Sequence, residues 1–371
     1  MWKIIDHYQW ENIRERFEWI RDMRQVPQDP EYHAEGDVET HTKMVLEALQ
    51  SQADYQQLNQ QEQHLLNAAV LLHDVEKRST TFTDIDGRIV SPGHARKGEL
   101  TSRRLLYREI PTPHIHRETV AKLVRYHGLP LWALEKPDPQ KAVIQASLEV
   151  NTRHLSLLAK ADVLGRICQD REELLYRIAL FEELCKENQC FGQAYPAFAN
   201  GYSRFFYFKK ENTLPDFAAY DDTEFEVVMM SALPGSGKDT YIRNNFKGWP
   251  VVSLDALRKK LKISPTDTAG NGKVIQEAKE AAKTYMRKRT SFVWNATNLS
   301  RQIRSQLIEL FTSYKARVRI IYLEVPYATL LSQNRNRIDV VPEPALHRMI
   351  RKLEVPSLTE AHTVEYHIRE E

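Results

Sequence analysis

The segment ALPGSGKDT, residues 232–240, has the glycine and lysine spacing of a loop that binds phosphate groups. It follows the apolar run FEVVMM and precedes DTYIRNNF, which gives the strand–loop–helix context that such a loop requires. Two glycines let consecutive backbone N–H groups face an anion, and the lysine side chain reaches the outer phosphates. The sequence therefore predicts that ATP or another NTP binds here. The predicted nucleotide-binding residues are Pro234, Gly235, Ser236, Gly237, Lys238, Asp239 and Thr240.

Two positions depart from the pattern G-x-x-x-x-G-K-[ST]. Ala232 replaces the first glycine, and Asp239 replaces the hydroxyl residue that usually contacts magnesium. A carboxylate is a hard oxygen ligand that suits Mg²⁺. We therefore expect Asp239 to bind Mg²⁺ directly or through water, with Thr240 or a water molecule as the alternative ligand.

Further polar residues follow the next apolar runs. Asp255 ends WPVVSLD, and Arg258 lies one helical turn later. An aspartate near the outermost phosphate is suited to deprotonate a hydroxyl acceptor, and an arginine can hold an acceptor phosphate. A helix N-cap aspartate with a surface arginine is the alternative.

Two later segments carry further polar residues. WNATN places Asn295 at the same expected sheet edge. Arg335 and Arg337 could belong to a lid over the phosphates or to a solvated face.

The first half of the chain carries a different set of chemical groups. LLHDVEK puts His73 and Asp74 at the end of an apolar helix, and further histidines and an aspartate fall on or beside other predicted helices. A lone histidine is usually structural, but several imidazoles and two carboxylates suffice for one transition-metal ion, or for two sharing Asp74. Mn, Fe, Co, Ni, Cu and Zn suit such ligands. Two ions would clamp a phosphate and supply hydroxide at neutral pH, which is phosphoester hydrolysis chemistry.

These residues need two kinds of scaffold. Up to about residue 193 the apolar residues recur at three-to-four spacing, which is typical of helices. From residue 225, β-branched apolar runs alternate with amphipathic segments, which indicates a parallel sheet with crossover helices. We therefore expect a helical domain over residues 1–211, a linker over 212–224 and an α/β domain over 225–371.

The composition agrees with a soluble, two-domain protein. The chain has 371 residues, of which 42% are hydrophobic and 27% charged. Because the net charge is only +2, a nucleic-acid partner would need a local basic groove. Cys168, Cys185 and Cys190 have no paired spacing, so we expect them to be reduced and buried. The sequence shows no signal peptide or membrane-spanning run, and we expect a cytoplasmic enzyme.

The second half resembles the polynucleotide 5′-hydroxyl kinase branch of the P-loop phosphotransferases. The resemblance rests on ALPGSGKDT, SLDALRKKL, WNATNLSRQIRSQL and the NRNR…VPEPALHRM stretch, over roughly residues 226–362. It implies that Lys238 binds the donor phosphates and that Asp255 is the general base for the 5′-OH. It further implies that Arg258 contacts the acceptor phosphate and that Arg335 and Arg337 engage the donor.

The order of histidines and aspartates in the first half resembles the HD phosphohydrolase superfamily, over roughly residues 31–166. HAEGDVETHT is especially similar to the HD module of bacterial tRNA-maturing nucleotidyltransferases. The resemblance makes Lys77 and Arg166 candidates to hold substrate phosphate, and it leaves open whether His33 or His41 is the first metal ligand. The implied metal ligands are His33, His41, His73, Asp74, His94, His127 and Asp162.

An HD phosphoesterase joined to a 5′-hydroxyl kinase resembles the bacterial HD-Pnk family of end-healing enzymes. That resemblance implies hydrolysis of 2′,3′-cyclic phosphate ends and phosphorylation of 5′-OH ends of RNA or DNA, by a monomer that supplies a separate ligase. One alternative is an HD nucleotidase or cyclic-nucleotide phosphodiesterase fused to a small-molecule kinase. Another is an NTP-responsive nucleic-acid binding module without catalysis.

Overall fold

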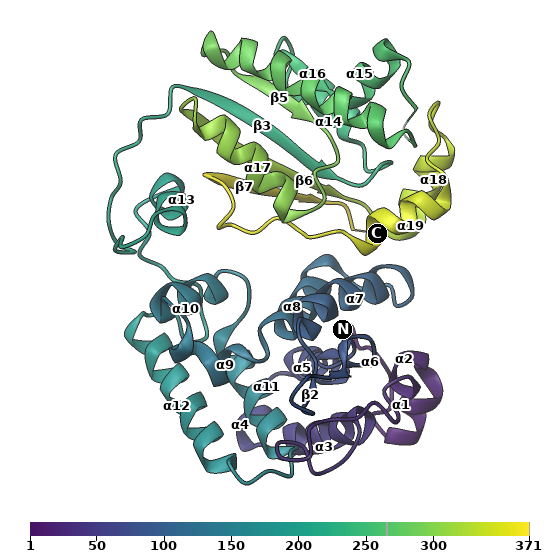
Figure 1. The fold of residues 1–371 in the computed structure, drawn as a ribbon, viewed down its shortest axis with the longest axis vertical. Helices are drawn as coiled ribbons and strands as arrows, with labels where there is room; N and C mark the ends of the chain where they lie inside the picture. Colours follow the sequence, from purple (N-terminus) through teal and green to yellow (C-terminus); the bar gives the residue numbers. More distant parts are fainter. Residues whose placement is uncertain (265, 371) are drawn as a thin grey trace. The chain divides into compact units, whose positions relative to one another are not determined.

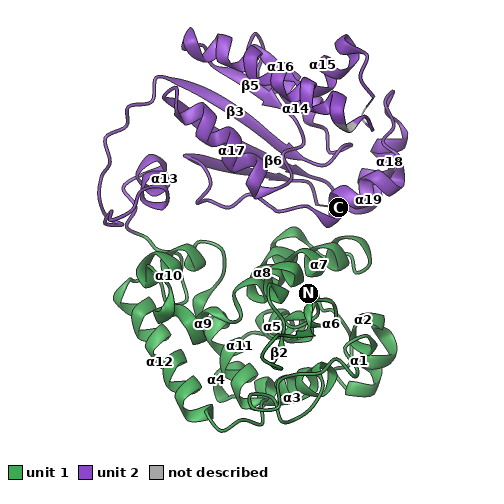
Figure 2. Ribbon diagram, in the orientation of Figure 1, with its two compact units in different colours: residues 1–196 green, residues 197–371 purple. Residues whose placement is uncertain are grey.

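The computed structural model describes residues 1–264 and 266–370, and the chain divides into two compact units. Unit 1 comprises Met1–Pro196 and unit 2 comprises Ala197–Glu371 (Figure 2). Each unit has its own hydrophobic core. Among the described residues, no helix is both long enough and apolar enough to cross a membrane.

Unit 1 is helical apart from a short antiparallel hairpin, in which β1 (Phe82–Thr83) pairs with β2 (Ile89–Val90) (Figure 1). The helices are α1 (Trp10–Arg16), α2 (Glu18–Arg21), α3 (Val38–Ser51), α4 (Ala53–Gln56), α5 (Gln60–Leu72), α6 (Lys77–Thr80), α7 (His94–Arg108), α8 (His114–Tyr126), α9 (Leu129–Trp132), α10 (Pro139–Ser147), α11 (Thr152–Leu164) and α12 (Arg171–Glu187), with a 3₁₀ turn at Ala133–Glu135.

Helix α5 is the centre of unit 1. It begins with a capping box in which Asn59 and Glu62 satisfy each other's backbone N–H groups. From residue 65 to residue 72 every side chain is buried, because α3, α8 and α11 all pack against this helix. The buried end of α5 therefore delivers the next residues, His73 and Asp74, into the interior.

The approach of α11 to α3 depends on a glycine. A methyl group at Gly165, which caps the C-terminus of α11, would lie 2.7 Å from the backbone nitrogen of Val45 in α3. Any side chain at this position would push the two helices apart. The close approach brings Asp162 of α11 and His41 of α3 together.

Unit 2 is an α/β domain with a parallel sheet, as the sequence predicted. The strands lie in the order β4-β5-β3-β6-β7, and each paired strand is parallel to its neighbour. The strands are β3 (Phe225–Ala232), β4 (Val251–Ser253), β5 (Phe292–Asn295), β6 (Ala316–Glu324) and β7 (Thr363–Ile368), and the helices are α13 (Gly201–Lys209), α14 (Lys238–Asn245), α15 (Leu254–Leu261), α16 (Thr268–Arg287), α17 (Arg301–Thr312), α18 (Tyr327–Arg335) and α19 (Glu343–Arg351).

The central strand β3 packs on both of its faces. Val227 and Met229 join the core formed with α16 and α17, whereas Val228 and Met230 join the core that includes Ile242 of α14. Because successive side chains in a strand alternate between faces, a strand buried on both sides reads as a continuous apolar run. This explains the FEVVMM segment.

The division between the units lies before the expected linker. Helix α13, which the sequence assigned to the first domain, belongs to unit 2. Arg204 donates hydrogen bonds to the carbonyl oxygens of Leu358 and His362, and the Phe205 ring lies 4.3 Å from the His362 ring. These contacts attach α13 to the segment that leads into β7, a strand that the sequence did not predict.

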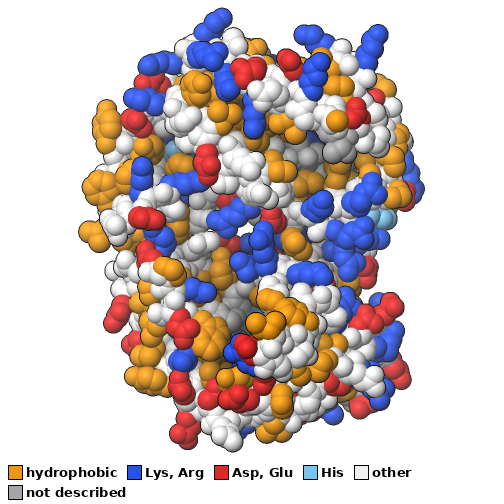
Figure 3. Space-filling view, in the orientation of Figure 1, with side chains coloured by type: hydrophobic (Ala, Val, Ile, Leu, Met, Phe, Trp, Pro, Cys, Tyr) orange, Lys and Arg blue, Asp and Glu red, His pale blue; other side chains and the backbone are white. Residues whose placement is uncertain are grey.

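The cysteines and the surface charges can be compared with the sequence-based expectations. Cys185 and Cys190 are buried as expected, but Cys168 is partly exposed, because it lies in the segment between α11 and α12 rather than in a core; all three are free. Basic and acidic side chains are interspersed over the visible face, in agreement with the small net charge (Figure 3).

Candidate functional site

Six predicted metal ligands of unit 1 converge from five helices. His41 lies in α3, His73 and Asp74 directly follow α5, His94 begins α7, His127 directly follows α8, and Asp162 lies in α11. Among the described residues, potential ligand atoms form three groups, within each of which they lie no more than 4.8 Å apart; these six residues make up two of them, and the third is His33, Glu35 and His41. The first group is His41, His73 and Asp162, and the second is Asp74, His94 and His127.

The Asp74 carboxylate faces both groups. Its Oδ2 atom lies 3.3 Å from Nε2 of His73 and 3.8 Å from Nε2 of His41. Its Oδ1 atom lies 3.4 Å from Nε2 of His94 and 3.9 Å from Nε2 of His127. A carboxylate with one oxygen toward each group is suited to bridge two cations.

Backbone carbonyl groups orient three of the histidines. Nδ1 of His73 lies 2.7 Å from the Val70 oxygen, Nδ1 of His127 lies 2.8 Å from the Val124 oxygen, and Nδ1 of His94 lies 2.7 Å from the Ser91 oxygen. Because a carbonyl only accepts hydrogen bonds, each Nδ1 carries the proton and each Nε2 keeps its lone pair for the centre.

The buried polar atoms at the centre fit a metal ion. Within the described part of the chain, Nε2 of His73 and Oδ1 of Asp74 are buried without a hydrogen-bond partner. Such groups are costly to bury unless something binds them. A cation would satisfy both lone pairs, and this donor set of imidazoles and carboxylates is one that transition metals favour.

Charge and burial set the protonation states at the centre. Burial, together with the neighbouring His94, lowers the pKa of His127 to about 3. Burial alone would raise the pKa of both Asp74 and Asp162. The charges of Lys77 and His73 nevertheless hold the pKa of Asp74 well below its usual value. The charge of Arg166 likewise holds the pKa of Asp162 well below its usual value. For His73, burial acts to lower the pKa, and the Asp74 charge outweighs it and raises the pKa.

Glu35 is a residue that the sequence interpretation missed. Its side chain is fully buried, and its Oε1 atom lies 2.9 Å from Nδ1 of His33 and 2.8 Å from Nδ1 of His41. Its Oε2 atom accepts a hydrogen bond from the Ile167 backbone at 2.9 Å. His41 Nε2 is then directed at Asp162 Oδ1, 3.0 Å away. The same carboxylate therefore contacts both histidines of the HAEGDVETHT segment, and only His41 belongs to the group that contains His73.

The two predicted phosphate-binding cations of unit 1 pair with the predicted acidic ligands Asp74 and Asp162. Lys77 lies 2.8 Å from Oδ2 of Asp74 and donates a second hydrogen bond to Gln28 at 2.7 Å. Arg166 contacts both carboxylate oxygens of Asp162, at 3.1 and 2.5 Å. The ion pair of Arg166 is thus with a buried candidate ligand and not with a surface acid.

The loop of unit 2 has the backbone shape that an anion site needs. Gly235 and Gly237 have φ angles of 91° and 90°, a region that disfavours residues with a side chain. Helix α14 begins at Lys238, so its first N–H groups end the loop. Ala232 is still part of strand β3, where its N–H donates to the Thr297 carbonyl at 3.0 Å. The missing first glycine therefore falls where no special backbone conformation is required.

Other predicted residues of unit 2 act electrostatically on Lys238. Burial is the main reason that the pKa of Lys238 falls to about 8. The charge of Arg337 also lowers this pKa, whereas the charges of Asp239 and Asp255 act to raise it. The Lys238 ammonium group donates to the carbonyl oxygens of Ala232 and Leu233 at 3.3 and 3.2 Å. Arg335 instead pairs with Glu343 at 2.7 Å.

The Asp255 carboxylate is not used as a helix cap. Ser253 caps α15, with its hydroxyl accepting from the Ala256 N–H at 3.3 Å. Asp255 is 71% exposed and pairs with Arg258, whose Nε donates to Asn271 at 2.7 Å. Its carboxylate is therefore available to an incoming hydroxyl group.

The Asp239 carboxylate is held by the neighbouring strand. Nδ2 of Asn295, the last residue of β5, donates to Oδ1 of Asp239 at 2.8 Å. Thr240 accepts a hydrogen bond from Arg243 at 3.3 Å. Asp239 rather than Thr240 is thus tied to the end of the sheet.

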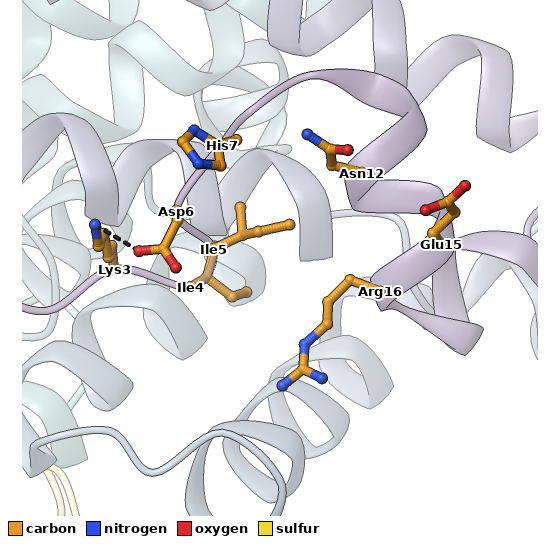
Figure 4. Close-up of a pocket in the computed structure, with 8 residues that line it drawn as sticks. All are labelled: Lys3, Ile4, Ile5, Asp6, His7, Asn12, Glu15 and Arg16. Atoms are coloured by element: carbon orange, nitrogen blue, oxygen red, sulfur yellow. Dashed lines mark ion pairs between the residues drawn. The ribbon is translucent and has the colours of Figure 1, made fainter.

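A surface pocket lies away from these predicted residues, at the N-terminal segment of unit 1 (Figure 4). An ion pair of 2.6 Å joins Lys3 to Asp6 on its wall. It contains none of the predicted site residues. The lining residues are Lys3, Ile4, Ile5, Asp6, His7, Asn12, Glu15 and Arg16.

Comparisons with known proteins identify the fold of unit 2. Residues 227–356 match the sequence profile of a family described as an AAA domain. No curated protein sequence matches the chain. Similar solved structures include a putative kinase from Chloroflexus aurantiacus J-10-fl, with 15% identity, 40% of this chain and 86% of that chain covered, and a TM-score of 0.34. A sugar kinase from Janibacter sp. HTCC2649 is 17% identical, with 39% of this chain and 85% of that chain covered and a TM-score of 0.31. A gluconokinase from Sinorhizobium meliloti 1021 is 17% identical, with 39% of this chain and 83% of that chain covered and a TM-score of 0.29. Residues 227–356 of unit 2 are thus similar to an AAA domain, in agreement with the P-loop at residues 232–240 and the parallel sheet.

Proposed function

We propose that the protein heals nucleic-acid ends. Unit 1 would be a metal-dependent phosphoesterase of the HD type that opens 2′,3′-cyclic phosphates and removes the remaining 3′ phosphate. Unit 2 would be a polynucleotide kinase that transfers a phosphate from an NTP to a 5′-OH end. The products are the 3′-OH and 5′-phosphate ends that a separate ligase joins.

One observation carries the proposal: Asp74 directs one carboxylate oxygen toward each of two histidine-containing groups. The orphaned lone pairs of His73 and Asp74 support the presence of metal at both groups. A phosphate ester bound across two cations is a substrate that such a centre would hydrolyse, and the ions would supply Lewis acidity and activate water.

The residues of unit 1 divide the work of hydrolysis. His41, His73 and Asp162 would hold one ion, His94 and His127 would hold the other, and Asp74 would contact both. Lys77 and Arg166, whose cationic groups already lie beside Asp74 and Asp162, would bind the phosphate oxygens of the substrate. His33 shares Glu35 with His41 but is partly exposed, which suits contact with substrate.

The residues of unit 2 fit transfer to a hydroxyl group. Lys238 would exchange its loop carbonyl partners for the donor phosphates, and Arg337 would neutralise charge on the transferred group. Asp255 would accept the proton of the attacking 5′-OH. Its ion pair with Arg258 would open so that the guanidinium group holds the acceptor phosphate.

A basic helix supports a polymeric acceptor. Arg258, Lys259 and Lys260 follow Asp255 in the last turn of α15, a helix without a fully buried residue. Arg258 pairs with Asp255, and Lys259 pairs with Asp339, both at 2.5 Å. Once released from these acids, the two cations and Lys260 would contact backbone phosphates of a chain longer than one nucleotide. A nucleoside or sugar offers nothing to such a surface.

An acceptor-length series tests the kinase assignment. The purified chain would receive ATP, Mg²⁺ and a nucleoside, a nucleoside 3′-phosphate or 5′-OH oligonucleotides of increasing length. We expect transfer to the oligonucleotides and its loss in Lys238→Ala. Phosphorylation of a nucleoside or sugar but of no oligonucleotide would contradict the proposal and favour a small-molecule kinase.

A further inference from the structure

The pair formed by Asp239 and Asn295 joins the two structural positions that hold magnesium in P-loop proteins. One position is the first turn of the helix after the loop, and the other is the end of a neighbouring strand. Asp239 stands in the first turn of α14, and Asn295 ends β5, which pairs directly with the loop strand β3 (Figure 1). Their side chains form a hydrogen bond of 2.8 Å.

The two residue types are exchanged relative to the usual arrangement. P-loop proteins place a Ser or Thr hydroxyl on the helix and an Asp carboxylate at the strand end. Here the carboxylate stands on the helix and an uncharged side chain stands at the strand end. The site thus keeps one carboxylate, and the negative charge has moved from the sheet to the loop.

The hydrogen bond leaves half of the carboxylate free. Asn295 binds Oδ1 of Asp239, and Oδ2 has no hydrogen-bond partner within the described residues. An amide can hold the carboxylate without repelling it, whereas a second carboxylate at 2.8 Å would raise the pKa of one of the two acids. Asn295 is therefore matched to an aspartate at position 239.

We propose that Asp239 and Asn295 form a magnesium site in which the usual residue types of the two positions are exchanged. Asp239 is the protein's ligand to nucleotide-bound Mg²⁺, and Asn295 is a positioning residue that fixes the orientation of the Asp239 carboxylate. This inference rests on the proposed kinase function of unit 2 and assigns Asn295 a role. A purely structural pair would behave differently, because an acidic residue in the first turn stabilises a helix without any metal.

Calorimetry of ADP binding to the full chain, with increasing Mg²⁺ and with none, separates the two roles. ADP is the probe because it reports the loop and the ion without any acceptor or turnover. The variants are Asn295→Ala, Asp239→Ser and the double exchange Asp239→Ser with Asn295→Asp. Asn245→Ala, an exposed asparagine at the far end of the same helix, is the matched control. Thermal unfolding of each variant checks its folding.

We expect Asn295→Ala to raise the Mg²⁺ concentration at half-effect by about 10- to 100-fold, the usual range for residues that orient a ligand. Metal-free ADP affinity should stay unchanged, and Asn245→Ala should match the wild type. Asp239→Ser should lose the magnesium response, and the double exchange should restore most of it, because it returns the usual hydroxyl and carboxylate to their positions.

Two results would overturn the exchange. One is a normal magnesium response in Asn295→Ala together with a lower unfolding temperature, which would make the pair structural. The other is a double exchange that responds to Mg²⁺ no better than Asp239→Ser. A wild-type chain that binds no ADP at any Mg²⁺ concentration would instead remove the proposed kinase function and this inference with it.

Discussion

At the scale of single residues, Glu35 connects the two histidines whose roles the sequence left open. Its buried carboxylate contacts Nδ1 of both His33 and His41. A carboxylate behind a metal-binding histidine fixes the ring and raises its basicity. We predict that Glu35→Gln lowers metal affinity by about 10- to 100-fold. Metal content after dialysis against graded chelator, measured by mass spectrometry of the metal, gives the readout.

Glu31→Gln is the matched control, since Glu31 lies in the same loop and is exposed. It should bind metal as the wild type does. The kinase activity of both variants should be unchanged, because Glu35 lies in unit 1. Wild-type metal retention in Glu35→Gln would exclude the orienting role.

The sequence indicated the candidate ligands but not the residue behind two of the histidines. His73, Asp74 and Asp162 could be proposed because their types and their places on predicted helices are visible in the chain. Glu35 could not, because its role depends on two ring nitrogens meeting one carboxylate. The available signal was an acid two residues after His33, which alone is typical of an exposed loop.

At the scale of elements, the crossing of α3 and α11 places His41 beside Asp162. We predict that Gly165→Ala destabilises unit 1 by about 1–3 kcal/mol, the usual effect of an added methyl in a packed contact. The new methyl would lie within 2.8 Å of the Val45 backbone. Hydrogen exchange measured by mass spectrometry should show faster exchange in both helices.

Gly128→Ala provides the comparison, because its methyl would meet only the Trp132 side chain at 3.9 Å. It should change stability by less than about 0.5 kcal/mol. Equal hydrogen-exchange rates in Gly165→Ala and the wild type would show that α3 and α11 can move apart without loss of stability. The close approach of the two helices would then not be what places His41 beside Asp162.

The contact of α13 with the segment before β7 makes unit 2 sensitive to acid. Burial is the main reason that the pKa of His362 falls to about 4, and its Nδ1 accepts from the Val318 N–H at 2.9 Å. Above pH 6.5 the ring is neutral in both folded and unfolded chains. As the pH falls from 6.5 toward 4, only the unfolded chain gains the proton, so stability is lost over this window.

The predicted loss at pH 5 is about 2 kcal/mol relative to pH 7. In His362→Asn the carboxamide oxygen would accept the same N–H but cannot be protonated in this range. The urea midpoints at the two pH values should therefore differ more in the wild type than in the variant. Equal pH dependence in the two proteins would refute the assignment.

The elements themselves were predictable to different degrees. The central strands of unit 2 were visible because burial on both faces produces continuous apolar runs such as FEVVMM. Strand β7 was not, since TVEYHI is an edge strand in which Tyr366 and His367 are exposed and only Val364 is buried. The place of α13 was also hidden, because it depends on long-range contacts such as Arg204 with Leu358.

At the scale of the whole molecule, each unit contains a complete set of candidate residues. We predict that Asp74→Asn abolishes phosphoesterase activity and spares the kinase. Asp255→Asn should do the reverse, with a kinase loss of about a hundredfold to ten-thousandfold, the usual range for a general base. Initial rates of both reactions, with unfolding temperatures as a check, provide the measurement. Loss of both activities in one folded variant would contradict two independent sites.

The most direct test of the central claim gives the protein an RNA oligonucleotide with a 5′-OH and a 2′,3′-cyclic phosphate. The reaction contains ATP with Mg²⁺ or, separately, Mn²⁺, and mass spectrometry follows both termini. The proposed function predicts that the 5′ end gains one phosphate while the 3′ end becomes a free diol. Consumption of ATP with both RNA termini unchanged would contradict it and would favour the small-molecule kinase instead.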